Sequence, residues 1–332
     1  MPTTAPPSWA GATSATSTWG LNPDFNFHDL DVLGVGPVAR QASAVFDRHW
    51  NSDWVRRLPR PQPGAGSLPL TPEMVALPLA AAANPAVRAI AAGQRDWTAE
   101  MLALVHTLSP GRSAVHADPP SRAEGSANRM PAAFRAVMRS AQHEVLITNA
   151  CIIPDAHFMQ DLRDLVARGV RVRILTKSLP SNDVPAVNAH YGPWRRPILD
   201  SGAALHELRA DAAIQAELVD TPPVRSAFVG LHSKAMVVDR ARCFIGSMNL
   251  DPRSEIFNAE MGVVVDSPAL ADALAQRMER DMGEANSWQV TATPDGGLRW
   301  TSQAVVLDQE PARSLWQRVA NLLFKLAPAT YY

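Results

Sequence analysis

The clearest pattern of hydrophobic and polar positions lies in the middle of the chain. Residues 144–153 (EVLITNACII) form a continuous apolar run, which is typical of a buried strand. Residues 155–169 repeat apolar positions with a helical period and end at Gly169, a residue type that often closes helices. Residues 170–176 alternate as a strand does. Strand, helix and strand in this order predict an α/β fold, with a mixed sheet flanked by helices.

The same pattern predicts further elements on both sides of this unit. Helices are expected over residues 38–50, 184–200, 267–282 and 312–326. Strands are expected over residues 29–33, 204–209, 232–239, 243–247 and 260–266, with a hairpin over 288–302 that turns at 294–297. We therefore expect one complete α/β domain over residues 130–332.

The first part of the chain carries weaker signals. Residues 1–20 lack the charged start and apolar core of a secretory signal, so a disordered leader is predicted there. Stretches rich in Pro, Gly and Ser at 57–68 and 117–128 predict linkers, and residues 58–129 are expected to form a helical and linker region. No apolar run reaches the roughly 18 residues that a membrane-spanning helix needs.

Composition and charge narrow the class of protein. The chain of 332 residues has 31 basic and 32 acidic residues, a net charge of −1. Because there is no basic excess, we expect no nucleic-acid partner. Two cysteines are too few for a disulfide framework, which fits a cytoplasmic location. Lysine is scarce, so the surroundings of Lys177, Lys234 and Lys325 are informative.

One segment, residues 231–254, gathers side chains suited to phosphate chemistry. His232 and Lys234 are two residues apart, which places both side chains on one face of a strand. A histidine that titrates near neutrality can attack phosphorus or donate a proton, while an ammonium group holds phosphate oxygens. Ser247 and Asn249, again two apart, would add neutral donors to the same phosphate. This chemistry requires neither a metal nor a cofactor.

A single H-x-K pair is more often part of an ordinary hairpin with a solvated lysine. Here the longer spacing H-x-K-x4-D-x6-G-S-x-N is complete, with Asp239 and Gly246 in register. This spacing resembles the signature of the phospholipase D superfamily. The flanking segments 168–202 and 249–265 resemble the C-terminal half of bacterial cardiolipin synthase-like proteins, a resemblance that covers about residues 130–330.

The resemblance implies a role for each polar residue of the motif. His232 would be the nucleophile that forms a phosphohistidine, or the acid that protonates the leaving alcohol. Lys234 and Asn249 would grip the phosphate, and Ser247 would be a further donor.

Two acidic residues complete the predicted catalytic set. The resemblance assigns to Glu260 the hydrogen bond that holds the second ring nitrogen of His232 and fixes its tautomer. Asp239, the acid of the motif, is expected to steady the hairpin or the contact between halves of the enzyme rather than to touch substrate.

The chain departs from the family pattern because cardiolipin synthases carry the motif twice. Of the nine histidines, His232 alone is followed two residues later by lysine. Residues 22–54 resemble the segment after the first motif, so residues 21–57 are predicted to be a remnant of a second domain, and the chain to begin just downstream of that motif. Three alternatives follow. Two copies of the chain pair as a homodimer, a separate chain supplies the second motif, or the chain is a truncated homologue that binds lipid or phosphate without turnover.

The expected activity is phosphatidyl transfer or phosphodiester hydrolysis, most like that of a cardiolipin synthase using phosphatidylglycerol. The alternative enzyme is a single-motif nuclease acting as a dimer, which the near-zero net charge disfavours. Membrane contact at the inner membrane surface would be peripheral. It would use either the segment 194–196 or the final helix, with Trp316, Leu322, Leu323, Phe324 and Lys325.

Overall fold

The computed structural model describes residues 8–9, 17–18, 20, 22–57, 88–89, 92–94, 96–120, 129–218 and 226–326. The chain divides into two compact units, one of residues 1–54 and 111–332 and one of residues 55–110. In the second unit the structure describes helix α4 (Trp97–Val105), whose N-cap Asp96 accepts a hydrogen bond from the Ala99 N–H at 3.0 Å. The predicted linkers lie largely outside the described residues.

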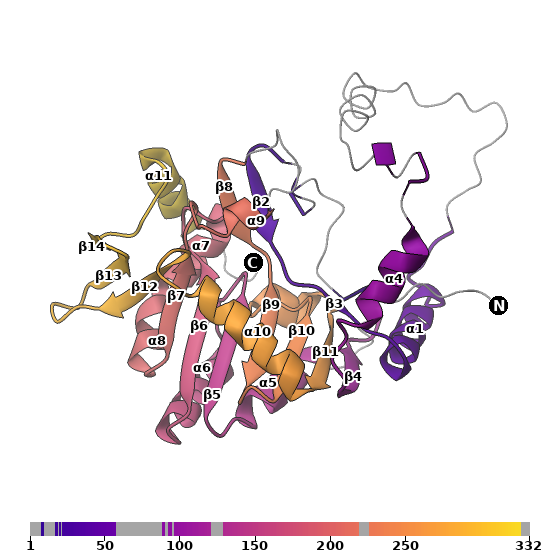
Figure 1. Cartoon of the computed structure of the whole chain (residues 1–332). Helices are drawn as coiled ribbons and strands as arrows, with labels where there is room; N and C mark the ends of the chain where they lie inside the picture. Colours follow the sequence, from indigo (N-terminus) through magenta and orange to yellow (C-terminus); the bar gives the residue numbers. More distant parts are fainter. Residues whose placement is uncertain are drawn as a thin grey trace. The chain divides into compact units, whose positions relative to one another are not determined.

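A mixed sheet of ten strands forms the centre of the first unit (Figure 1). Its strand order is β14-β13-β12-β7-β6-β5-β9-β10-β11-β4. β5, β6 and β7 run parallel to one another, and the other neighbours pair antiparallel. The strands are β4 (Arg112–Ala117), β5 (Glu144–Asn149), β6 (Arg171–Lys177), β7 (Ala204–Leu208), β9 (Lys234–Val238), β10 (Arg242–Gly246), β11 (Met261–Asp266), β12 (Ser287–Ala292), β13 (Leu298–Ser302) and β14 (Val305–Leu307).

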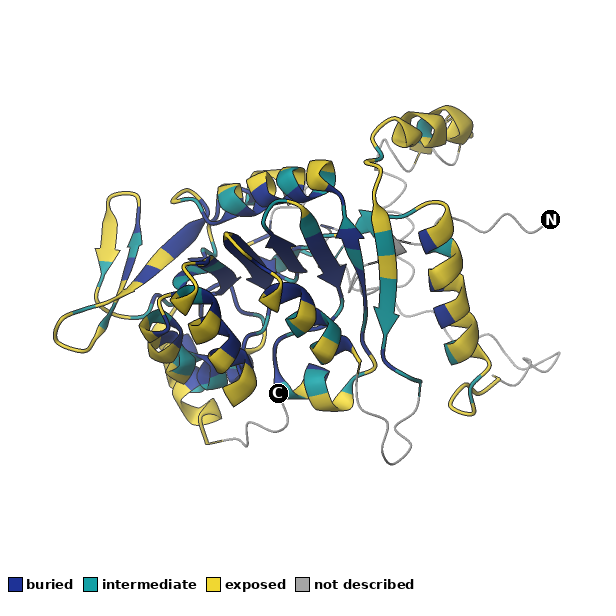
Figure 2. Cartoon of the chain, turned by 90° about the horizontal axis from the view of Figure 1, so that it is seen from below, coloured by how far each residue is buried: buried dark blue, intermediate teal, exposed yellow. Residues whose placement is uncertain are grey.

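Helices cover both faces of this sheet. The described helices of the first unit are α1 (Pro37–Trp50), α5 (Met130–Arg139), α6 (Ala156–Ala167), α7 (Pro185–Tyr191), α8 (Arg195–Asp200), α9 (Gln215–Leu218), α10 (Pro268–Asp281) and α11 (Leu315–Phe324), with short turns η1 (Gly192–Trp194) and η2 (Arg253–Phe257). α5, α6 and α8 bury apolar side chains in the core on one face, and α10 and α1 do so on the other. Figure 2 shows the buried strands between these helices. The predicted α/β fold is confirmed.

Most predicted elements are present within one or two residues, and three segments differ from the prediction. The helix expected over 184–200 is divided at Gly192 into α7, η1 and α8. β4 lies in the region where the sequence predicts helix and linker. It is an edge strand with half-buried and exposed side chains, so its hydrophobic pattern is weak. Most of the predicted disordered leader lies outside the described residues, and its described part includes β1 (Ser8–Trp9), which pairs with β3 (Val32–Leu33).

A separate pair of strands brings the start of the chain to the motif. β2 (Phe25–His28) runs parallel to β8 (Phe228–Leu231), as Figure 1 shows. A Cβ on Gly230 would lie 3.2 Å from the Phe27 ring, so glycine permits this close approach. His28 anchors β2, because its buried Nε2 lies 2.6 Å from the Asp281 carboxylate in α10 and its carbonyl accepts the His232 N–H at 2.9 Å.

Candidate active site

The H-x-K residues lie at one edge of the sheet, at the ends of strands β8, β9 and β5. β8 ends at Leu231, β9 begins at Lys234, and Lys234 pairs in register with Asn149, the last residue of β5. β6 runs parallel to β5 and ends at the same edge. In α/β folds the carboxyl ends of parallel strands are the usual position of a functional site. The fold therefore places His232 and Lys234 where a site is expected.

His232 is held by a carboxylate from the start of the chain. Its Nδ1 lies 2.6 Å from Oδ2 of Asp29, and the two side chains are 21% and 12% exposed. The imidazole also packs against the ring of Phe27, with 4.9 Å between ring centres. Because Asp29 accepts the Nδ1 proton, Nε2 is the ring nitrogen left with a lone pair for reaction.

The charge on Asp29 is stabilised by its neighbours. Burial acts to raise the pKa of this carboxyl, but the hydrogen bond and positive charge of His232, followed by the charge of Lys234, lower the pKa below its ordinary value. The backbone N–H of Leu30 donates to Oδ1 at 2.8 Å. Asp29 is therefore suited to remain a carboxylate beside the imidazole.

The predicted contact between Glu260 and His232 is wrong. The Glu260 carboxylate accepts hydrogen bonds from the Ser247 hydroxyl and, at 2.9 Å, from Nδ2 of Asn258. Strand order explains this, because β10 lies between β9 and β11 and its end carries Ser247 between His232 and Glu260. Asp29 reaches His232 through the pairing of β2 with β8.

Lys234 is 3% exposed, and its ammonium donates to the carbonyl of His232 at 2.6 Å. Burial lowers the pKa of Lys234 to about 8, and the charge of Asp29 opposes this shift. The lysine therefore carries its charge below this pH and loses much of it above. A buried cation next to a histidine nucleophile can stabilise the charge that develops on phosphate oxygens.

Ser247 and Asn249 lie just beyond the end of β10. A Cβ on Gly246 would lie 2.6 Å from the carbonyl oxygen of Met261, so the close approach of β11 requires glycine before Ser247. The Ser247 hydroxyl is engaged by Glu260, and it accepts the Met261 N–H at 3.1 Å. Ser247 thus ties two strands together.

Asn249 differs from Ser247, because its buried Oδ1 has no hydrogen-bond partner among the described residues. The loop that carries Asn249 is held by Asn149, which donates to the Met248 carbonyl and accepts from the Leu250 N–H, both at 3.2 Å. Buried polar atoms are nearly always hydrogen-bonded in folded proteins. The unpaired Oδ1 of Asn249 can therefore accept a hydrogen bond from a ligand.

Asp239 lies at the other end of β9 and is not part of this edge. Strand geometry places it about 16 Å from Lys234. Its carboxylate accepts three backbone N–H groups, from Gln142, His143 and Glu144, at 2.8, 2.8 and 2.9 Å. Asp239 also has a positive φ of 52°, in the tight turn between β9 and β10. Asp239 fixes this turn, as the sequence predicts, but it lies away from His232 and so does not belong with the catalytic residues.

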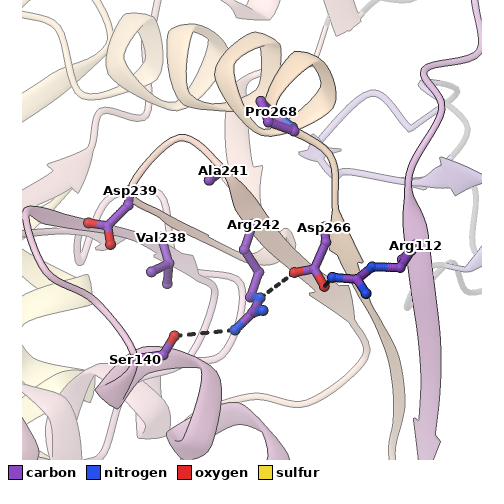
Figure 3. A pocket seen from close by; sticks show the side chains of 8 residues that line it. All are labelled: Arg112, Ser140, Val238, Asp239, Ala241, Arg242, Asp266 and Pro268. Carbon is purple, nitrogen blue, oxygen red and sulfur yellow. Dashed lines mark hydrogen bonds and ion pairs between the residues drawn. The ribbon is translucent and has the colours of Figure 1, made fainter.

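A pocket of about 390 Å³ opens at this turn (Figure 3). It is lined by Arg112, Ser140, Val238, Asp239, Ala241, Arg242, Asp266 and Pro268. Arg242 pairs with Asp266 and lies 3.4 Å from the hydroxyl of Ser140. The pocket is formed at the opposite end of β9 from Lys234, so it is separate from the edge that carries His232.

Comparison with known proteins agrees with the motif. The family profile described as "Cardiolipin synthase, PLD-like domain" matches residues 134–282. Cardiolipin synthase C of Escherichia coli K12 is 29% identical over 327 residues, 94% of this chain and 67% of that protein. Both matches support a member of the phospholipase D superfamily.

Other similar proteins match shorter parts of the chain. Cardiolipin synthase A of Pseudomonas aeruginosa PAO1 is 31% identical over 153 residues, 46% of this chain and 27% of that protein. The crystal structure of phosphatidylserine synthase from Haemophilus influenzae Rd KW20 is similar over 66% of this chain and 46% of that chain, with a TM-score of 0.43 and 18% identity.

The structure adds Lys177 to the site, where the sequence patterns did not place it. Lys177 ends β6 and is 4% exposed, and its ammonium pairs with Asp183 at 2.5 Å. The ammonium lies 5.6 Å from the centre of the Phe27 ring, the same ring that packs against His232. Its charge also helps to lower the pKa of Lys234, after the larger effect of burial. The scarcity of lysine was the signal, since two of the three lysines are buried close together.

Proposed function

We propose that this chain catalyses phosphatidyl transfer in the manner of a cardiolipin synthase, with phosphatidylglycerol as donor and acceptor and His232 as nucleophile. The observation that carries this proposal is the His232 imidazole, held through Nδ1 by Asp29 beside the buried ammonium of Lys234. The similarity to cardiolipin synthase C along nearly the whole chain supports the choice of a phospholipid substrate.

In the first step Nε2 of His232 attacks the phosphorus of the donor lipid. A P–N bond forms, the P–O bond to the departing glycerol breaks, and the glycerol oxygen takes a proton. Lys234 and Nδ2 of Asn249 would donate hydrogen bonds to the non-bridging oxygens as charge builds up on them. Asp29 stabilises the positive charge of the substituted imidazole.

In the second step a hydroxyl of another phosphatidylglycerol displaces His232. A P–O bond forms, the P–N bond breaks, and the acceptor hydroxyl loses its proton. Attack by phosphatidylglycerol yields cardiolipin, and attack by water yields phosphatidic acid.

Proton transfer in both steps needs a second acid–base group, because Nε2 of His232 is bonded to phosphorus in the intermediate. The sequence holds one H-x-K pair. We assign this role to the histidine of a second motif, carried by a second copy of the chain or by a separate polypeptide. Mixing an inactive His232→Ala chain with wild type separates these two sources. If two copies of the chain share one site, mixed pairs are inactive, and the mixture loses more activity than dilution of the wild type explains.

The test of the function is capture of the phosphohistidine. The chain is mixed with phosphatidylglycerol labelled at phosphorus, denatured at alkaline pH within one turnover, digested and mapped. Label on the peptide that contains His232, absent in His232→Ala and chased into cardiolipin by unlabelled lipid, is the expected result. A labelled oligonucleotide serves as a second substrate. A folded sample with no label and no turnover of the lipid would contradict the proposal, and cleavage of the oligonucleotide alone would favour a nuclease.

The lowered pKa of Lys234 predicts the alkaline side of the pH profile. The lysine is charged below its pKa of about 8 and neutral above it, so kcat/KM for phosphatidylglycerol should fall as pH rises through 8. In Lys234→Arg this fall should disappear, because arginine keeps its charge. In Lys177→Met it should move to higher pH, because a neighbouring positive charge is removed. An unchanged alkaline limb in both variants would assign it to another group.

A further inference from the structure

The last helix, α11, is inverted relative to an ordinary surface helix. Its buried side chains are polar, Gln317 and Asn321, which lie one turn apart. On α11 and the turn after it the large exposed side chains include Leu315, Trp316, Val319, Leu322, Leu323 and Leu326, here called the α11 face. At helical spacing these six residues form one stripe, about 120° wide, on the side opposite the buried pair. A surface helix normally buries such a stripe.

Specific hydrogen bonds hold α11 in this orientation. Nε2 of Gln317 donates to the Leu179 carbonyl at 2.8 Å, and Oδ1 of Asn321 accepts from Nδ2 of Asn188 in α7 at 3.1 Å. Figure 1 shows α11 beside α7. Rotating the helix about its axis to bury the apolar stripe would break both hydrogen bonds. The bonds made by the polar side therefore keep the α11 face exposed.

The charged side chains of the segment 311–326 are all basic. Arg313, Arg318 and Lys325 are exposed, and residues 311–326 contain no Asp or Glu. Arg318 and Lys325 are seven residues apart, so they share one flank of the stripe. Tryptophan and leucine on one side with basic residues at the flank are typical of helices that lie in the interface of an anionic membrane.

We infer that the α11 face docks on an anionic lipid surface and holds the site against the source of its substrate; the choice of lipid as occupant rests partly on the proposed function. The helix is tied to the loop at 178–184 by the bond from Gln317 to Leu179 and by a 3.4 Å bond from Arg313 to the Asn182 carbonyl. The same loop carries Asp183, the partner of Lys177. Lipid drawn from that surface would enter beside the catalytic edge.

The small size of the α11 face disfavours a second copy of the chain as its occupant. A helix of ten residues is about 15 Å long, and its one face is much smaller than the ~800 Å² that each partner of a stable dimer buries. It is also too short to cross a bilayer, and none of the described helices is long and apolar enough to do so. The segment 194–196, the other predicted membrane contact, is excluded. Trp194 packs against the core, and the buried Arg195 pairs with Glu207.

The test is co-flotation of the full chain with vesicles of phosphatidylglycerol and phosphatidylcholine, compared with phosphatidylcholine alone. Wild type should bind the anionic vesicles, and binding should weaken in high salt. The double variant Leu322→Glu/Leu323→Glu should bind at least about tenfold more weakly, and Trp316→Ala several-fold more weakly. The matched control is Trp50→Ala on α1, where Trp50 is 62% exposed against 73% for Trp316, and it should bind within about twofold of wild type.

The outcomes separate this inference from the proposed function, because binding is measured without turnover. His232→Ala should bind vesicles as wild type does, so a chain that binds but transfers no lipid would leave the docking surface standing. Wild-type binding by the double variant, or an equal loss in Trp50→Ala, would overturn the inference. Sedimentation in the absence of lipid tests whether a second copy of the chain occupies the α11 face. A wild-type dimer that the double variant converts to monomer would overturn it in favour of a second copy on this face.

Discussion

Replacement of Asp29 by asparagine is expected to lower the rate of phosphatidyl transfer by about 10²–10⁴-fold with the fold intact. Asp29 accepts the Nδ1 proton of His232 at 2.6 Å. An asparagine can turn its NH2 group toward Nδ1, which favours the tautomer with the proton on Nε2 and removes the attacking lone pair. The loss of the carboxylate also removes the charge that stabilises the substituted imidazole. Initial rates with labelled phosphatidylglycerol measure the effect, and circular dichroism checks the fold.

Two matched acids serve as controls for this prediction. Asp31→Asn removes a carboxylate two residues away whose pKa is raised by burial and by the charge of Asp29, and it should change the rate by less than about threefold. Glu260→Gln weakens the bond to Ser247 and should cost less than Asp29→Asn. If Glu260→Gln were the more damaging variant, the assignment of Asp29 as the residue that positions His232 would be wrong.

Replacement of Glu207 by alanine is expected to destabilise the first unit by about 3–5 kcal/mol. Glu207 is fully buried in β7 and accepts hydrogen bonds from Arg195 at 2.5 Å and from Tyr191 and Trp300 at 2.9 Å each. Alanine would leave a buried guanidinium and two buried donors short of a partner. The shift of the urea midpoint at pH 7, converted with the measured slope, gives the change in free energy of unfolding.

An exposed ion pair on α8, the helix that carries Arg195, is the control for burial. Arg196 and Asp200 are four residues apart, lie at 2.8 Å and are about half exposed, so Asp200→Ala should cost less than about 1 kcal/mol. The double variant Arg195→Met/Glu207→Leu should recover a large part of the stability that Glu207→Ala loses, because neither buried charge remains. Equal costs for Glu207→Ala and Asp200→Ala would show that the buried network contributes little.

Local pattern was sufficient to predict the α/β fold. The apolar run of β5, the helical period of α6 and the alternation of β6 each depend on neighbouring residues, and the structure has all three elements within a few residues of the prediction. β4 was missed because an edge strand that is half exposed leaves no strong alternation. The sequence had the apolar residues of the final helix as one of two candidate membrane contacts, but it did not predict that the polar side of α11 is buried. Its apolar stripe is visible in the sequence, but the side of the helix that faces the protein depends on hydrogen bonds to Leu179 and Asn188.

The sequence by itself determined the motif and the placement of His232 and Lys234 on one face of a strand. It also showed that lysine is scarce, which drew attention to Lys234 and Lys177. Tertiary structure alone decided which acid holds the histidine. Asp29 and His232 are 203 residues apart, and only the pairing of β2 with β8 joins them, whereas the interposed β10 directs Glu260 to Ser247. Spacing along a strand fixes the face on which a side chain lies, but its partner depends on the strand that lies beside it. That order is set by packing across the whole domain.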